Sequence, residues 1–178
     1  MRCVVLPLFL LAMLGHAFLI PRRLPTTAVR RFLTTTILIV GKKNGGESFI
    51  DEGCALYEKR LRPTMTVNTV FLKSDEALVD AAMAAKGTVM ALDESGKEYT
   101  SREFSDVVFK GLEDGGAALT FIVGGAYGLP PEIKGAAKFQ PFISLSRMTW
   151  THQMARLLLL EQLYRAAEIR KGTSYHKD

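Results

Sequence analysis

Titratable side chains gather near the end of this 178-residue chain, in a segment that runs from Leu145 to Ala166. The segment opens with small and polar residues as far as Thr151 and continues as an apolar-periodic helix. That helix carries His152, Arg156, Glu161, Tyr164 and Arg165. A loop that offers backbone groups, followed directly by such a helix, is a common way to build a ligand site. The alternative is a plain turn into a core helix, with Glu161 and Arg165 as an ordinary ion pair.

Two other stretches place polar or flexible residues where a strand ends. The glycine-rich loop Gly124–Gly128 follows a continuous apolar run, and Asp93 follows Leu92 at the end of another β-branched and apolar run. Because the carboxyl ends of parallel strands meet at one edge of a sheet, these loops and the one after Leu145 predict a ligand crevice there. The glycine spacing matches neither the dinucleotide fingerprint nor a Walker loop, so a tight turn is the alternative.

The order of elements predicts an α/β domain with a largely parallel sheet covered by helices on both faces. The expected strands are Thr36–Val40, Thr66–Leu72, Thr88–Leu92, Leu119–Val123 and Phe142–Leu145, with Asp93–Gly96 as a turn. The expected helices begin at Ser48, Ser74, Thr100, Pro131 and just after Thr151. The first helix is expected to turn Phe49, Cys54, Leu56, Tyr57 and Leu61 inward.

Residues 1–35 are predicted to be a bipartite targeting leader, and residues 36–178 the working domain. Arg2, the apolar run Val4–Leu14 and the small residues ending at Ala17 form a secretory-type signal. Residues 18–36 are rich in Arg and Thr and contain no acid, which is typical of a transit peptide. The pair resembles the plastid-targeting leaders of algae with secondary plastids, with a mitochondrial presequence as the alternative. No membrane segment is expected in the mature protein.

Charge and cysteine content exclude several classes of protein. The formal charge is +5, but the leader holds five arginines and no acid, so the remaining 18 basic residues balance the 18 acidic ones. The overall charge of the domain therefore gives no sign of nucleic-acid binding. Residues 134–178 hold eight basic residues against three acids, a weak local signal for a polyanion. With only Cys54 outside the leader, neither a disulfide framework nor a cysteine-based metal site is expected.

Taken together in order, these blocks resemble the RlmH methyltransferases of the SPOUT superfamily, which modify N3 of a pseudouridine in large-subunit ribosomal RNA. The similarity covers residues 36–178. It rests on Tyr57–Leu61, Leu92–Lys97, Gly124-Gly-x-x-Gly128-Leu129, Leu145-Ser-x-Met-Thr-x-x-His152-Gln-Met-x-Arg156, Glu161-Gln-x-Tyr164-Arg165-Ala and Tyr175-His176-Lys177.

The resemblance implies a C-terminal trefoil knot, a homodimer and S-adenosylmethionine held in the knot loops. It places the cofactor contacts on Leu92, Gly124, Leu145, Ser146, Arg147, Met148, Thr149 and Trp150. It implies large-subunit ribosomal RNA as the partner, and the near-neutral charge of the mature chain suits RNA that is presented within an assembled ribosome. No metal is needed, because the methyl donor is already activated.

Methyl transfer to a ring nitrogen requires positioning and removal of the imide proton. The candidate catalytic residues are His152, Arg156, Tyr164, Arg165, Tyr175 and His176. The tail residues Tyr175 and His176 are ordinarily a solvated terminus, but the resemblance implies that they reach the partner's pocket. The competing hypotheses are a knotted RNA-binding or ribosome-assembly factor without activity, and a nucleotide-binding oxidoreductase, which the missing fingerprint disfavours.

Overall fold

A computed structural model describes residues 32–43 and 48–177 of the chain. Within that part, five parallel strands form one sheet in the order β2-β1-β4-β3-β5. The strands are β1 (Leu33–Val40), β2 (Met65–Leu72), β3 (Thr88–Glu98), β4 (Ala118–Val123) and β5 (Ile143–Ser144). The helices are α1 (Ser48–Leu61), α2 (Asp75–Ala84), α3 (Ser101–Asp114), α4 (Pro131–Gly135), η1 (Ala137–Phe139) and α5 (His152–Lys171). The predicted α/β fold with a parallel sheet is confirmed.

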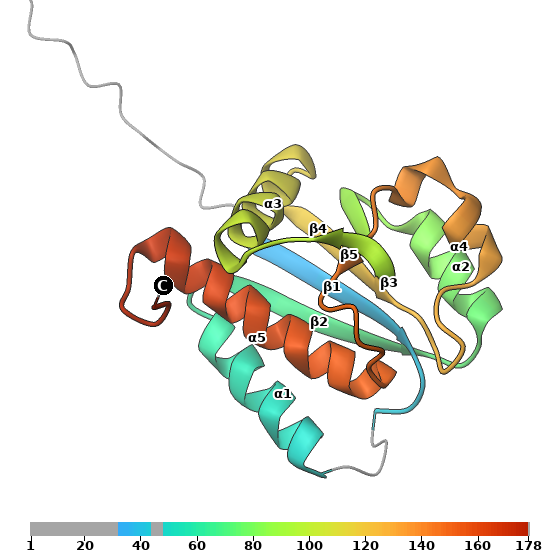
Figure 1. Ribbon diagram of the computed structural model, residues 1–178, viewed down its shortest axis with the longest axis horizontal. Helices are drawn as coiled ribbons and strands as arrows, with labels where there is room; N and C mark the ends of the chain where they lie inside the picture. Colours follow the sequence, from blue (N-terminus) through green and yellow to red (C-terminus); the bar gives the residue numbers. More distant parts are fainter. Residues whose placement is uncertain (1–31, 44–47, 178) are drawn as a thin grey trace, which may run out of the picture. The chain divides into compact units, whose positions relative to one another are not determined.

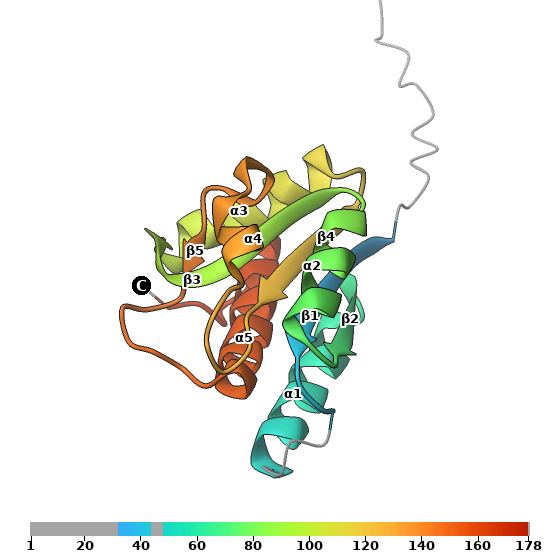
Figure 2. The ribbon, with the colours of Figure 1, turned by 90° about the vertical axis from the view of Figure 1, so that its right-hand side faces the viewer.

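Helices cover both faces of the sheet (Figures 1 and 2). Along β1 and β4, alternate side chains enter opposite cores, as the two-residue period of a strand requires. Ile37 and Phe121 pack with α1, α3 and α5, whereas Leu38 and Ile122 pack with α2, α4 and η1. This double burial explains why these strands read as continuous apolar runs in the sequence.

The helix starts follow the capping signals in the sequence. Ser74 caps α2 by accepting a hydrogen bond from the Ala77 amide, and Thr100 forms the predicted capping box with Glu103. Thr151 caps α5 by accepting from the Met154 amide. The last of these caps fixes the point where the loop after β5 becomes a helix, and it therefore positions His152.

The first strand begins three residues before the predicted boundary at Thr36. Leu33–Thr35 pair with β2, and Thr34 and Thr35 also pair with β4. The Thr35 side chain is fully buried. Consecutive β-branched residues favour a strand, so the threonines assigned to the leader belong to the sheet. The rest of the predicted leader, residues 1–31, lies outside the described residues.

Two local predictions are wrong. Residues Asp93–Gly96 belong to the long strand β3, which pairs with Ile143 through both Leu92 and Lys97, so the intervening residues bulge out of the ladder. In α1, Phe49 and Leu56 are exposed, because the helix buries the face that carries Ile50, Cys54 and Leu61. Those three positions share one side of a 3.6-residue period, and Phe49 and Leu56 do not.

No helix in the described part of the chain combines the length and the apolar character needed to cross a bilayer.

Candidate active site

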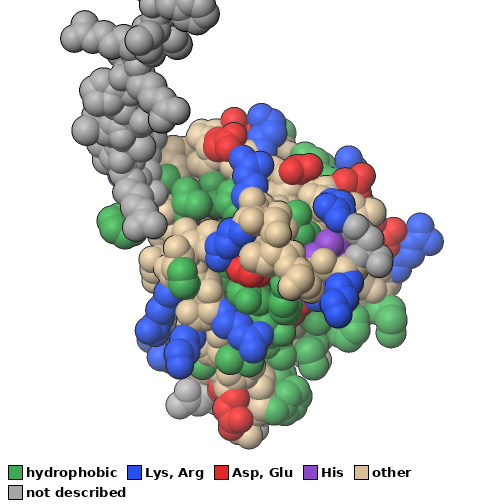
Figure 3. Space-filling view, turned by 90° about the vertical axis from the view of Figure 1, so that its left-hand side faces the viewer, with side chains coloured by type: hydrophobic (Ala, Val, Ile, Leu, Met, Phe, Trp, Pro, Cys, Tyr) green, Lys and Arg blue, Asp and Glu red, His purple; other side chains and the backbone are tan. Residues whose placement is uncertain are grey.

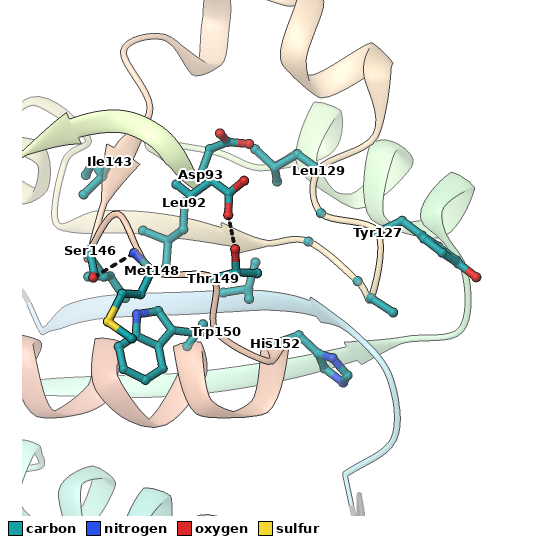
Figure 4. A pocket seen from close by; sticks show the side chains of 18 of the residues that line it. Leu92, Asp93, Tyr127, Leu129, Ile143, Ser146, Met148, Thr149, Trp150 and His152 are labelled. Carbon is teal, nitrogen blue, oxygen red and sulfur yellow. Dashed lines mark hydrogen bonds between the residues drawn. The ribbon is translucent and has the colours of Figure 1, made fainter.

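A cavity of about 340 Å³ opens beside the bulge of β3 and the carboxyl ends of β4 and β5 (Figure 4). Three strand-end segments and the start of α5 form its walls. Its lining residues are Leu92–Glu94, Val123–Leu129, Lys134, Ile143, Leu145, Ser146, Met148–Trp150, His152 and Ala155. The predicted ligand crevice therefore exists where the strand ends meet.

Seven of the eight predicted cofactor contacts line this cavity, from Leu92 and Gly124 to the loop after β5. Arg147 is the eighth, and its side chain points away from the lining. The Arg147 guanidinium is exposed and pairs with Glu98, with Nε 3.5 Å from Oε1. Only the backbone of Arg147 remains available for a contact with a bound cofactor.

The glycine loop is held by its own backbone. Gly125 and Gly128 form an isolated bridge, and Gly128 adopts a positive φ of 82°. A Cβ on Gly124 would lie 2.3 Å from the carbonyl carbon and oxygen of Gly128. Gly124 is therefore required for the loop to close on itself. This requirement excludes a side chain at position 124 even when no ligand is bound.

The polar lining comes partly from residues that the sequence did not single out. The Lys134 ammonium lies 2.9 Å from Asp93 Oδ2, and the Ser95 amide donates to Asp93 Oδ1 at 3.0 Å. Burial favours a raised pKa for Asp93, but the hydrogen bonds from Ser95 and Lys134 outweigh it and hold the pKa below its ordinary value. The sequence showed Asp93 at a strand end, but nothing in it signalled Lys134.

A hydrogen bond crosses the mouth of the cavity. The Thr149 hydroxyl donates to Glu94 Oε2 at 2.6 Å, which ties the loop after β5 to the bulge of β3 (Figure 4). The same loop is stiffened internally, because the Met148 amide donates to the Ser146 hydroxyl at 3.0 Å. The loop that lines the cavity is thus fixed at both its start and its tip.

His152 and Arg156 are one helical turn apart, but the structure separates their surroundings. His152 lines the cavity, and its ring packs against Gly41 at the end of β1. The Arg156 guanidinium is buried and turns toward α1 and β2, where Nη2 lies 2.7 Å from Asp51 Oδ1 and the group stacks over Phe71. Arg156 is not among the residues that line the cavity.

The four remaining catalytic candidates cluster around the C-terminal half of α5. Tyr175 packs edge-on against Tyr164 with ring centroids 4.8 Å apart, and its hydroxyl donates to Glu161 at 3.1 Å. Arg165 pairs with the same Glu161 carboxylate at 2.6 Å and lies 3.4 Å from His176 Nδ1. The tail is therefore anchored on the helix and is not a frayed terminus.

The environment of this cluster sets the charge state of its members. Burial raises the pKa of Tyr175 well above its ordinary value, and the adjacent Tyr57 hydroxyl and Glu161 carboxylate raise it further. The hydrogen bond to Glu161 raises the pKa of Arg165. Near neutral pH, Tyr175 is therefore a hydrogen-bonding phenol and Arg165 a fixed cation, and neither serves as a proton acceptor.

The cavity and the tail cluster lie toward opposite ends of α5. Tyr164 lies twelve positions after His152, which corresponds to roughly 18 Å along a helix. Basic side chains are interspersed with hydrophobic ones on the side of the molecule where the chain ends (Figure 3). Within one chain, the six predicted catalytic residues therefore divide into a cavity residue, a buried ion-pair residue and a distant cluster of four.

Comparison with known proteins agrees with this architecture. A family described as predicted SPOUT methyltransferase matches residues 33–176. A protein of Protochlamydia amoebophila named ribosomal RNA large subunit methyltransferase H is 38% identical over 145 residues, covering 82% of this chain and 99% of the relative. Proteins of the same name from Prochlorococcus marinus (strain MIT 9303) and Cytophaga hutchinsonii are 40% and 36% identical, covering 79% and 77% of this chain and 91% and 95% of theirs. This chain therefore belongs to the SPOUT methyltransferase family, together with the relatives named ribosomal RNA large subunit methyltransferase H.

Proposed function

We propose that this chain is an S-adenosylmethionine-dependent ribosomal RNA methyltransferase that acts on N3 of a pseudouridine in the large-subunit RNA of an organellar ribosome. The observation that carries the proposal is the cavity between the bulge of β3 and the loops that follow β4 and β5, since it lies at the edge of the sheet where parallel α/β sheets bind ligands. Family membership supplies the reaction class, and the names of the relatives supply the substrate class.

The residues of the cavity fit S-adenosylmethionine. Leu92, Ile143 and Leu145 offer apolar walls for an adenine ring, and the loop backbones offer donors and acceptors for its edge. Gly124 and Gly125 line the cavity without side chains, so a ribose can approach their backbone closely. When bound, the cofactor supplies an electrophilic methyl group on a sulfonium, which a ring nitrogen can accept in line.

The protein's own contribution is to position the base and to accept the proton that leaves N3. His152 is the imidazole that lines the cavity, so we assign it as the proton acceptor or as the group that orients the base. Arg165 is a fixed cation suited to stabilising negative charge on the carbonyl oxygens of the base. Tyr164, Tyr175 and His176 pack around Arg165 and hold its orientation.

A homodimer reconciles the two separated groups of residues. The tail cluster lies roughly 18 Å along α5 from the cavity of its own chain, so it reaches a cavity only if a second copy presents it. The hydrogen-bonded, packed state of Tyr175 and His176 supports a preformed tail that docks as a unit. In this arrangement each site combines the cofactor loops of one subunit with the tail of the other. The trefoil knot stays a prediction from the family resemblance.

The sequence of the predicted leader, residues 1–35, supports delivery to a plastid, with the mitochondrion as the alternative destination. A fluorescent protein fused behind residues 1–32 tests this part of the proposal. Fluorescence confined to the plastid supports it, and a purely cytosolic or secreted signal contradicts it.

A methylation assay on ribosomes tests the reaction. The domain from Phe32 onward is incubated with labelled S-adenosylmethionine and with 70S ribosomes from a bacterium whose own enzyme has been deleted. We expect label in a single pseudouridine of the large-subunit RNA. Tight ribosome binding without transfer of label would instead favour the inactive assembly factor.

Subunit mixing tests the shared site. Chains that lack residues 175–178 are mixed with chains that carry Gly124→Ala, each of which is expected to be inactive alone. The mixed dimer retains one intact cavity facing one intact tail, so part of the activity should return. If no activity returns although heterodimers form, each tail serves its own chain and the shared-site proposal is wrong.

A further inference from the structure

Tyr127 is the most exposed large side chain at the rim of the cavity. Its relative exposure is 99%, although it belongs to the loop that lines the cavity. In Figure 4 its ring extends outward from the loop, away from the cavity interior. Because the ring is fully exposed and belongs to the loop that lines the cavity, it is free to contact a molecule outside the monomer.

The loop holds this ring in a defined place. The bridge between Gly125 and Gly128 closes the loop on either side of Tyr127, and Gly128 takes the left-handed conformation that the turn requires. Gly125 packs against Val40 at the end of β1 and against Asp75 at the start of α2. Tyr127 is therefore presented from a closed turn that rests on two secondary-structure elements.

Three exposed lysines follow the neighbouring strands β1 and β2. Lys42 and Lys43 follow β1, and Lys73 follows β2, at the same edge of the sheet as the cavity. All three are exposed, and none forms an ion pair with a carboxylate among the residues that the structure describes. Gly41, directly before Lys42, packs against His152, so the lysines lie beside the proposed catalytic residue.

We propose that Tyr127 is a stacking platform for an RNA base next to the target nucleotide, and that Lys42, Lys43 and Lys73 hold the adjacent phosphates. Single-stranded RNA is recognised by aromatic rings that stack on unpaired bases and by cations that follow the backbone. An exposed ring at the cavity and exposed ammonium groups at the same edge of the sheet provide both. This inference rests on the proposed function for the identity of the RNA, but it concerns binding and not methyl transfer.

The same surface is open to a second copy of the chain, which is the competing occupant. The charges favour RNA, because three exposed lysines gain more from phosphates than from a subunit whose domain is close to neutral. A ring that packed in a subunit interface would change the oligomeric state when removed, whereas a base-stacking ring would not. The two occupants are therefore separable by experiment.

The test compares Tyr127→Ala, Tyr127→Phe and a control, Met83→Ala, which removes an exposed hydrophobic side chain from α2 away from the cavity. Affinity for unmethylated 70S ribosomes is measured with S-adenosylhomocysteine present, alongside the oligomeric state and the affinity for S-adenosylmethionine. Loss of one stacking ring should weaken ribosome binding by about 5- to 150-fold. Tyr127→Phe and Met83→Ala should bind as the unchanged protein does, and Tyr127→Ala should bind the cofactor normally.

A second arm tests the lysines. Changing Lys42 or Lys73 to Gln should lower the slope of log affinity against log salt by about one per phosphate contact. In the methylation assay, Tyr127→Ala should raise KM for ribosomes more than it lowers kcat.

The outcomes separate this inference from the proposed function. Ribosome binding that depends on Tyr127, in a protein that transfers no methyl group, would retain the inference and reject the function. Methylation with unchanged ribosome affinity in Tyr127→Ala would reject the inference and retain the function. A change in oligomeric state in Tyr127→Ala would assign the ring to a subunit interface, and absence of ribosome binding by the unchanged protein would reject both.

Discussion

The ion pair between Asp51 and Arg156 offers a test of whether Arg156 acts in catalysis or in holding the fold. The Arg156 side chain is only 4% exposed, and Nη2 lies 2.7 Å from Asp51 Oδ1. The guanidinium stacks 5.1 Å above the ring of Phe71, and its Nε has no hydrogen-bond partner among the described residues. The pair joins α1 to the first turns of α5, directly after His152. We therefore expect Arg156 to position the start of α5 and to contact neither cofactor nor RNA.

The geometry predicts unequal effects for the two partners. Removing one member of a fully buried pair costs about 3–5 kcal/mol, because an unpaired charge stays behind. The Asp51 side chain is 40% exposed, so water can partly replace it, and we expect about 1–3 kcal/mol for Asp51→Ala. Arg156→Met removes the buried charge itself and keeps an apolar stem over Phe71, so we expect less than about 1 kcal/mol.

Thermal unfolding and the methylation assay together decide between the two roles. For a domain of this size, 1 kcal/mol shifts Tm by about 2–4 °C, so Asp51→Ala should lower Tm by about 2–12 °C. Asp114→Ala is a matched control, since it breaks the exposed pair with Lys110 and should change stability by less than about 0.5 kcal/mol. At a temperature where all variants are folded, Arg156→Met should retain most of kcat.

The reasoning fails if Arg156→Met is as stable as the unchanged protein but loses more than about a hundredfold in kcat while Asp51→Ala keeps it. That pattern is the signature of a group that stabilises the transition state. Arg156 would then be a catalytic residue, as its spacing from His152 predicts. The buried Arg156 side chain would then have to become accessible when cofactor or RNA binds.

Three further predictions follow from the site and its surroundings. Gly124→Ala should abolish cofactor binding by forcing the loop open, whereas Gly125→Ala, whose Cβ meets its neighbours no closer than 3.4 Å, should bind normally in calorimetry. Hydrogen bonds hold the pKa of Asp93 below its ordinary value, so the Asp93 carboxylate stabilises the fold at neutral pH. This stabilisation is lost as pH falls through the lowered pKa. Asp93→Asn should therefore make Tm depend less on pH on the acid side of the Tm–pH curve. A chain that starts at Thr36 should melt several degrees below one that starts at Leu33, since it lacks strand pairs and a buried threonine; equal melting would show that β1 needs only its second half.

The sequence predicted the sheet and the walls of the cavity because both depend on local signals. Continuous apolar runs mark strands buried on both faces, and the capping residues Ser74, Thr100 and Thr151 mark where helices begin. Parallel strands bring their carboxyl ends to one edge without any further information. The loops that follow Leu92 and Val123 were therefore expected to meet, and they do.

Features that depend on contacts between distant residues were not predictable in the same way. Asp93–Gly96 has the composition of a turn, but pairing with Ile143 draws it into a bulged strand. Lys134 contacts Asp93 across the cavity rim, and no spacing in the sequence relates the two. The inner face of α1 was predicted only in part, because Cys54 and Leu61 are buried as expected but Phe49 and Leu56 are exposed. Packing against α5, where Gly53 lies close to Leu157, decides which side of the helix is buried.

The division of the predicted catalytic residues along α5 follows from the same distinction. The motif from His152 to Arg165 is short in sequence, but a straight helix holds its two ends far apart. Its first residue borders the cavity, whereas its last meets Tyr175 and His176 near the opposite end. Because α5 is rigid and packed along its length between α1 and α3, bending cannot bring these ends together. If all six residues act in one reaction, the cluster around Arg165 must come from a second subunit. The family motif would then describe a site that two subunits share.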